Sequence, residues 1–314
     1  MKTATNPSRC TALRWLALAL CLAVASVPLA ETQTASSATA LQKRFSNLQH
    51  ELAQSAFGRP LYLDSVQNSG DLSGDVYAIV EYPFSRVKAA LDKPEDWCDV
   101  LILHLNIKQC RTGGGPPFSA LVVYIGTKHA QRLATVPRID FDFRVLADSA
   151  QYLQIELRAG AGPLGTRNYR VMLEAIPLDS GRSFLHMTYS YHYGRLALLA
   201  MQGYLATIGS GKIGFTVVGR TVDGSPVYVT DVRGVIERNA MRYYLAIDAY
   251  VRTFDLPIQD KLERRLHEWF AATERYALQL NELSEREYLE MKREEIRRQQ
   301  IAGASSGQVN GANR

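Results

Sequence analysis

Three tyrosines alternate along one segment of the sequence, at Tyr189, Tyr191 and Tyr193. In an extended strand, this spacing puts all three rings on the same face. Inside a cavity, such a row would give a ligand apolar walls and hydroxyl groups that orient it. The alternative is that the tyrosines pack against a helix or stand on the outer face of a sheet.

A second group of candidate residues follows the glycine-rich turn at 160–165. An arginine at this position, Arg167, could donate two hydrogen bonds to a carboxylate or phosphate headgroup. Otherwise it is an ordinary surface arginine in a hairpin. The full candidate set for ligand binding comprises Tyr124, Arg167, Tyr169, Tyr189, Tyr191, Tyr193 and His192.

Other patterns that could support catalysis or metal binding are weak. His186 and His192 share strand parity, but six extended residues span roughly 20 Å, which is too far for one ion. Residues 209–214 match the glycine pattern of dinucleotide binding, yet they follow a predicted helix and precede a strand, the reverse of a phosphate-binding turn. We therefore predict no metal, no cofactor and no catalytic residue.

The first 30 residues have the composition of a secretory signal peptide. Lys2, Arg9 and Arg14 precede the apolar run 15–27, which is shorter than the roughly 20 apolar residues of a membrane-spanning helix. Cleavage fits after Ala25 or after Ala30, and we prefer Ala30 because polar, acidic sequence follows it. The sequence thus predicts an exported protein, most simply a periplasmic one.

Export also constrains charge and cysteine chemistry. Cleavage removes two of the four cysteines, and it lowers the basic residues from 36 to 33, against 31 acidic ones. That balance does not favour a nucleic-acid partner. The remaining pair, Cys98 and Cys110, predicts a disulfide in an oxidising compartment, with two separate buried thiols as the alternative.

A sheet must position most of these residues. Runs at 61–66 and 76–82 predict a hairpin, and from 105 to 193 apolar residues alternate with polar ones, as at Ile139, Phe141, Phe143 and Val145. This pattern predicts an antiparallel meander of about five strands with one dry face. Short helices are expected after Pro83 and Pro94.

Helices are predicted before and after the sheet segments in the sequence. A flexible lead over 31–39 should precede a helix with Leu41, Phe45, Leu48 and Leu52 on one face. Helices at 196–208 and 235–254 flank a further hairpin. An apolar seam over 262–283 has coiled-coil-like spacing and either packs back on the domain or binds another helix. Ser284 and Glu287 fit a capping box.

This order of elements resembles the helix-grip fold of the StAR-related lipid-transfer (START) domains and of polyketide cyclase-like proteins. The resemblance rests on the strand that runs into a helix over 75–91, on the Trp97 region and on the meander that ends at 184–193. It implies an α+β fold in which a curved antiparallel sheet wraps around a long C-terminal helix, with helical extensions at both ends. Either 196–208 or 235–254 would be the gripped helix.

The resemblance also implies a division of the chain and a function. We expect a signal peptide (1–30), a linker and N-terminal helix (31–59), a START-like domain (60–254), a C-terminal helical extension (255–301) and a disordered tail (302–314). The implied function is binding or carrying a lipid or sterol-like ligand in a cavity, without catalysis. The alternatives are an enzyme that uses His104 or His192, and an envelope protein that interacts through its C-terminal helix. The expected partners include a membrane surface and a second copy of the chain.

Overall fold

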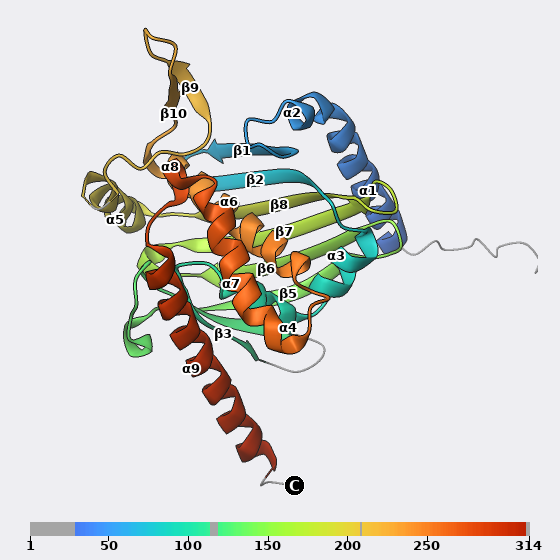
Figure 1. Ribbon diagram of the computed structural model, residues 1–314, viewed down its shortest axis with the longest axis vertical. Helices are drawn as coiled ribbons and strands as arrows, with labels where there is room; N and C mark the ends of the chain where they lie inside the picture. Colours follow the sequence, from blue (N-terminus) through green and yellow to red (C-terminus); the bar gives the residue numbers. More distant parts are fainter. Residues whose placement is uncertain (1–28, 114–118, 208, 312–314) are drawn as a thin grey trace, which may run out of the picture.

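The computed structural model describes residues 29–113, 119–207 and 209–311. Eight strands form one antiparallel sheet in the order β1-β2-β8-β7-β6-β5-β4-β3 (Figure 1). Their bounds are β1 Leu61–Gln67, β2 Asp71–Val80, β3 Ile107–Gly113, β4 Ser119–Ile125, β5 Arg138–Asp148, β6 Leu153–Ala161, β7 Arg167–Pro177 and β8 Ser183–His192. The meander therefore has six strands where the sequence predicted about five, and the predicted hairpin extends it as β1 and β2.

The predicted alternation of buried and exposed residues is present in β5. Ile139, Phe141 and Phe143 are buried, whereas their neighbours in the strand are exposed. The prediction is wrong at Val145, which is 39% exposed. The alternation ends here, because a register shift against β6 lies directly after Val145, between Val145 and Ala147.

The remaining elements are helical apart from a second, small sheet. The helices are α1 Leu29–Asn47, α2 Gln49–Ala53, α3 Phe84–Leu91, α4 Pro94–Leu101, α5 Arg195–Ala206, α6 Asp231–Arg252, α7 Ile258–Glu274, α8 Ala277–Leu280 and α9 Glu285–Gly311. Short 3-10 turns occupy Leu133–Thr135 and Pro163–Gly165. Strands β9 Val217–Arg220 and β10 Pro226–Tyr228 form the predicted second hairpin. None of the helices in the described residues is long and apolar enough to span a bilayer.

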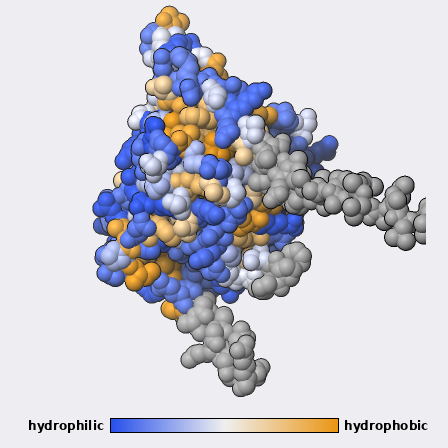
Figure 2. Space-filling model, turned by 90° about the vertical axis from the view of Figure 1, so that its right-hand side faces the viewer, coloured by the Kyte–Doolittle hydropathy of each residue, from blue (hydrophilic) through white to orange (hydrophobic). Residues whose placement is uncertain are grey.

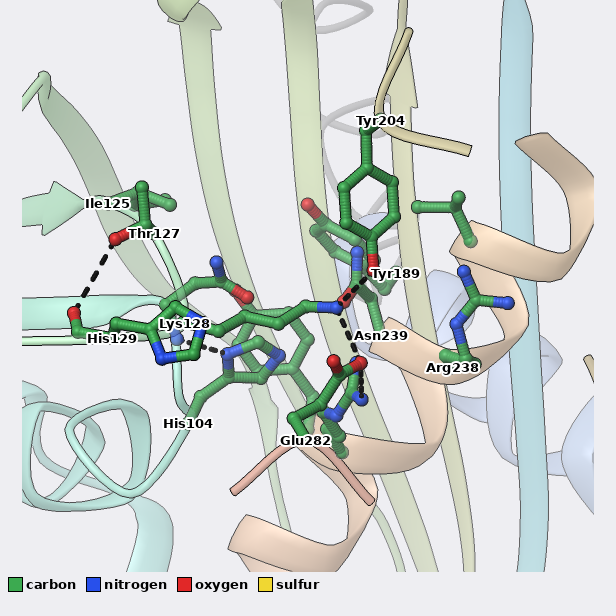
Figure 3. A pocket seen from close by; sticks show the side chains of 14 residues that line it. His104, Ile125, Thr127, Lys128, His129, Tyr189, Tyr204, Arg238, Asn239 and Glu282 are labelled. Atoms are coloured by element: carbon green, nitrogen blue, oxygen red, sulfur yellow. Dashed lines mark hydrogen bonds and ion pairs between the residues drawn. The ribbon is translucent and has the colours of Figure 1, made fainter. Parts of the chain in front are cut away.

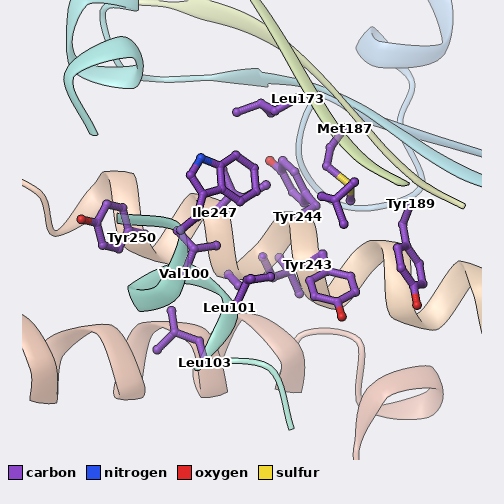
Figure 4. Close-up of a cluster of buried hydrophobic side chains, with 14 of the residues drawn as sticks. Val100, Leu101, Leu103, Leu173, Met187, Tyr189, Tyr243, Tyr244, Ile247 and Tyr250 are labelled. Atoms are coloured by element: carbon purple, nitrogen blue, oxygen red, sulfur yellow. The ribbon is translucent and has the colours of Figure 1, made fainter. Parts of the chain in front are cut away.

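Helix α6 is the gripped helix, which decides between the two candidates from the sequence. It crosses the inner face of the sheet and contacts β2, β1 and β8 (Figure 1). The backbone of β2 approaches it closely at Gly74, where an added Cβ would lie 2.9 Å from the Cβ of Ala240. Figure 4 shows the core between sheet and helix, where Leu173 and Met187 face Tyr244 and Ile247. The α+β helix-grip prediction is confirmed by this topology.

The outer face of the sheet is only partly exposed to solvent. Helix α1 covers it, and Leu41, Leu48 and Leu52 pack in a second core cluster with Tyr77 and Phe184. The flexible lead predicted over 31–39 is wrong, because α1 begins at Leu29 and includes it. The signal-peptide prediction lies almost wholly on residues 1–28, which are outside the described residues.

The C-terminal segment is part of the same core. Leu266, Trp269 and Leu280 of the predicted seam are buried against the domain, as are Tyr288 and Ile296 of α9. The capping box is present, since the Ser284 backbone N–H donates to Oε2 of Glu287 at 2.9 Å. The seam is divided between α7 and α8 and does not form one long helix. The prediction of a disordered tail is wrong for residues 302–311, because the α9 backbone continues to Gly311.

Two further features bear on the predictions. The Cys98–Cys110 disulfide is present and joins α4 to β3, with the Cα atoms 5.1 Å apart.

The tip of the β9–β10 hairpin presents hydrophobic side chains at the top of an otherwise mixed surface (Figure 2). The exposed apolar residues of this hairpin are Val217, Val218, Val222 and Val227.

Candidate functional site

A cavity of about 450 Å³ lies between α6 and the sheet, at the end where α5 and the β4–β5 connection meet the helix. This volume is within the range of roughly 300–1,000 Å³ that is typical of small-molecule sites. The apolar part of the wall comes from Tyr189, Tyr243, Ile125 and Val235. The Tyr189 and Tyr243 rings lie 4.9 Å apart at one end of the core shown in Figure 4.

A cluster of charged side chains forms another part of the cavity wall (Figure 3). Lys128 donates to the hydroxyl of Tyr204 at 2.6 Å and to Oε1 of Glu282 at 2.5 Å. Arg242 donates to the same carboxylate oxygen at 2.9 Å. These contacts join the β4–β5 connection, α5, α6 and the link from α8 to α9 around one acidic side chain.

The pKa values in this cluster follow from burial and charge. Burial alone would raise the pKa of Glu282, but Arg242 and Lys128 lower it below its ordinary value. Burial and then the positive charge of Arg242 lower the pKa of Lys128 to about 8, despite the partly opposing effect of Glu282. Glu282 is therefore ionised at neutral pH, and Lys128 is close to losing its proton.

His104 is a buried polar residue of the cavity wall. Its ring stacks on Tyr243 with centroids 4.5 Å apart, and its Nδ1 accepts a hydrogen bond from the Asn106 backbone N–H at 3.1 Å. This bond assigns the proton to Nε2, which has no hydrogen-bond partner in the part of the chain that the structure describes. Burial, followed by Arg242 and Lys292, lowers the pKa of His104 well below its ordinary value, so the ring is neutral.

Helix α9 fixes the segment that carries His104. The buried Lys292 of α9 donates to the backbone oxygens of His104 and Ile107, at 2.7 and 2.8 Å, and pairs with Glu295. Lys108 of β3 pairs with the same Glu295 at 3.0 Å. The C-terminal helix is thus a structural support of the cavity wall, which the division of the chain at residue 254 did not anticipate.

Tyr189 is the one residue of the predicted ligand-binding set that lines the cavity. The other six do not line this cavity. Tyr169 and Tyr191 are buried and stack on each other at 5.3 Å, and the Tyr193 hydroxyl accepts a hydrogen bond from Gln67. Packing therefore explains most of the tyrosine row.

The last three members of the set also lie elsewhere. Arg167 is exposed at the start of β7, where it pairs in register with His192, and Tyr124 is half-buried opposite Arg138. The Nδ1–H of His192 donates a hydrogen bond to Oδ1 of Asp71 at 2.9 Å, away from the cavity.

The two candidate histidines lie in different surroundings. His192 bonds to Asp71, and both residues line a separate pocket of about 200 Å³, whereas His104 lies in the wall of the 450 Å³ cavity and bonds to a backbone N–H. The described residues also contain no group of three His, Cys, Asp or Glu side chains that could hold a metal ion.

Sequence reasoning missed most of the cavity wall. Arg238 and Arg242 are four residues apart in the sequence of α6, which is a signal for two charged side chains on one helix face. Lys128, Tyr204 and Glu282 gave no comparable signal, because they come from loops or a helix that are distant in the sequence.

No family model matches the chain, and no curated protein matches its sequence. Among solved structures, human StAR-related lipid transfer protein 5 is similar at 9% identity and a TM-score of 0.35, over 71% of this chain and 99% of that one. Zhui aromatase/cyclase from Streptomyces sp. R1128 is similar at 11% identity and a TM-score of 0.32, over 67% and 94%. Norcoclaurine synthase from Thalictrum flavum is similar at 12% identity and a TM-score of 0.32, over 46% and 80%. The START-like, helix-grip arrangement of this chain follows from its own strand order and from the position of α6.

Proposed function

We propose that this protein binds or carries a hydrophobic small molecule in the cavity between the sheet and α6. The observation that supports the proposal is a concave space of about 450 Å³ with aromatic and aliphatic walls and a few convergent polar groups. Burial of apolar ligand surface against such walls contributes roughly 25 cal/mol per Å² before the costs of association are subtracted. A lipid-sized chain would thus gain several kcal/mol from burial in the cavity before those costs.

Ligand content and ligand binding test this proposal directly. Native mass spectrometry and organic extraction of the purified protein should reveal a bound apolar molecule, and a fluorescent fatty acid should bind saturably. Val235→Trp introduces a larger side chain into the cavity wall and should weaken this binding at least tenfold. Val218→Trp is the matched control, because Val218 is 55% exposed on the hairpin. Absence of ligand and of saturable binding in the wild type, or equal binding by Val235→Trp, would contradict the proposal.

We further propose that the protein acts after export. The basic start and apolar run of residues 2–27 support this, as does the use of Cys98 and Cys110 in a disulfide. N-terminal sequencing of the protein from a periplasmic fraction should give Glu31, or Ser26 if cleavage follows Ala25. A protein that keeps Met1 and stays in the cytoplasm would contradict export. Contact with a membrane surface and self-association remain predictions from the sequence.

A further inference from the structure

The cavity wall has more positive than negative charge. Among the described residues that line it, Lys128, Arg238 and Arg242 are cationic and Glu282 is the acidic one. A fourth cation, Lys212, lies 3.7 Å from Glu282 and shares the same carboxylate. One acidic side chain is thus the ion-pair partner of three cations, and Arg238 makes no ion pair with it.

Arg238 is the least compensated of these cations. Its side chain is buried, and its one hydrogen bond among the described residues goes from Nη1 to the backbone oxygen of Ile213 at 3.0 Å. The adjacent Glu237 is committed elsewhere, because it accepts hydrogen bonds from Ser65 and Thr216. Burial and then the charge of Arg242 lower the pKa of Arg238 to about 10, so the guanidinium stays charged at neutral pH.

Unpaired donors accompany this charge. The Nε atom of Arg242 and the Nε2 atom of His104 are buried in the wall without a hydrogen-bond partner among the described residues. A buried donor without an acceptor costs roughly 1–3 kcal/mol, so native proteins seldom leave several of them together. His104, Arg238 and Arg242 come from two segments that converge on one cavity (Figure 3). An oxygen-rich anion would satisfy them together.

We infer that the ligand is an amphiphile with an anionic headgroup, a carboxylate or a phosphate, which lies against Arg238, Arg242, Lys128 and the His104 Nε2–H. The inference rests on the proposed function and specifies its ligand class. Arginine suits this role because its planar guanidinium donates two parallel hydrogen bonds to either anion. The apolar chain then lies along Tyr189, Tyr243 and Ile125.

A set of ligands with one common chain tests the headgroup separately from the chain. The delipidated full-length mature protein is titrated by calorimetry with dodecanoate, dodecyl phosphate, dodecanol and inorganic phosphate. We expect at least one of the two anionic amphiphiles to bind about tenfold or more tightly than dodecanol, and inorganic phosphate to bind far more weakly. The tighter of the two amphiphiles identifies the headgroup as carboxylate or phosphate.

Variants assign the effect to the cationic wall. Arg238→Gln should weaken binding of the preferred anion about tenfold and leave dodecanol binding within twofold, whereas Arg238→Lys should restore part of the loss. Arg264→Gln is the control, since it removes the same charge from an exposed position on α7. Thermal unfolding of each variant verifies that it is folded. If Arg238→Gln does not fold, Arg238→Lys takes its place, and this variant should weaken binding of the preferred anion but not of dodecanol.

The outcomes separate this inference from the proposed function. Equal affinity for dodecanol and both anions, or equal losses for alcohol and anion in the Arg238 variants, would overturn the anionic headgroup while leaving a hydrophobic ligand in place. If inorganic phosphate binds as tightly as dodecyl phosphate, the inference that the ligand is an amphiphile would be wrong. No binding of any of the four probes would overturn the inference and the proposed function together.

Discussion

Arg242 donates a hydrogen bond from Nη2 to Oε1 of Glu282 across 2.9 Å, and the two residues lie 40 positions apart in the sequence. The guanidinium is 1% exposed and the carboxylate 8%, so the pair is largely shielded from water. Lys128 and Lys212 meet the same carboxylate from two other loops. Glu282 therefore holds together the segments that surround the cavity.

Replacement of Glu282 by glutamine should destabilise the protein strongly. Glu282→Gln leaves Arg242 and Lys128 buried without an opposite charge, a change that typically costs about 3–5 kcal/mol. Chemical denaturation at pH 7 measures this loss, with Glu294→Gln on the exposed face of α9 as the control. Because the folded pKa of Glu282 is lowered, its contribution is present above about pH 4.5 and is lost as the pH falls further. A loss below 1 kcal/mol at pH 7 would contradict this role.

The affinity for an anionic amphiphile should fall as the pH rises past 8. Burial and Arg242 lower the pKa of Lys128 to about 8, so this cation loses most of its charge by pH 9.5, whereas Arg238, with a pKa of about 10, keeps most of its own. We expect dodecanoate to bind about three- to tenfold more weakly at pH 9.5 than at pH 7, because one charged hydrogen-bond donor is lost. Lys128→Met should bind weakly at both pH values. Dodecanol affinity should not change, and an identical pH profile in Lys128→Met would count against this assignment.

His186 should stabilise the outer face of the sheet in a pH-dependent way. Its two ring nitrogens lie 2.8 Å from Asp75 and from Glu174. Burial alone would lower the pKa of His186, but the hydrogen bonds with these carboxylates outweigh it and raise the pKa. The contribution of His186 is thus complete below about pH 6.5, and it is lost as the pH rises through the folded pKa.

The variant His186→Gln tests this dependence. It should cost about 1–3 kcal/mol between pH 5 and 6.5, with a smaller difference from the wild type at pH 9. Below about pH 4 the difference should shrink again, because Asp75 and Glu174, whose pKa values are lowered, then take up protons. Thermal unfolding across this pH range is the measurement, and a difference that is constant with pH would refute a charged His186.

A side chain at position 74 should disturb the contact between β2 and α6. In Gly74→Ala the new Cβ would lie 2.9 Å from the Cβ of Ala240 and 3.3 Å from the backbone oxygen of Ile236. Overpacking of this kind typically costs about 1–3 kcal/mol. Gly160→Ala is the matched control, because an added Cβ in that strand meets nothing within 4 Å. Urea denaturation should therefore separate the two variants, and equal midpoints would show that α6 can move aside freely.

Removal of the chain after Phe254 should prevent folding. Trp269, Leu280 and Tyr288 are buried in the main core, and each such side chain contributes roughly 1.5–3 kcal/mol. Their sum is comparable to the total stability of about 5–15 kcal/mol of a typical domain. Circular dichroism and size-exclusion chromatography of the truncated protein should show loss of tertiary structure. A folded, monomeric product would instead restore the C-terminal segment as a separate extension.

Local patterns in the sequence determined the elements of this protein. Apolar alternation at Ile139, Phe141 and Phe143 predicts a half-buried strand, because side chains alternate between the faces of a sheet. The bulge near Val145 was not predictable, since it depends on pairing with β6. The pair Cys98 and Cys110 was predictable as a candidate disulfide from compartment and count alone.

Tertiary structure decided the site. Tyr189 and Tyr191 lie on one face of β8 and Tyr193 follows the end of this strand, but only the packing of α5 and α6 determines that Tyr189 reaches the cavity while Tyr191 stacks on Tyr169. Lys128 and Glu282 are 154 residues apart, and no local period relates them. Local periodicity records which side of an element is apolar, whereas a binding site depends on contacts between distant segments that form only when the chain folds.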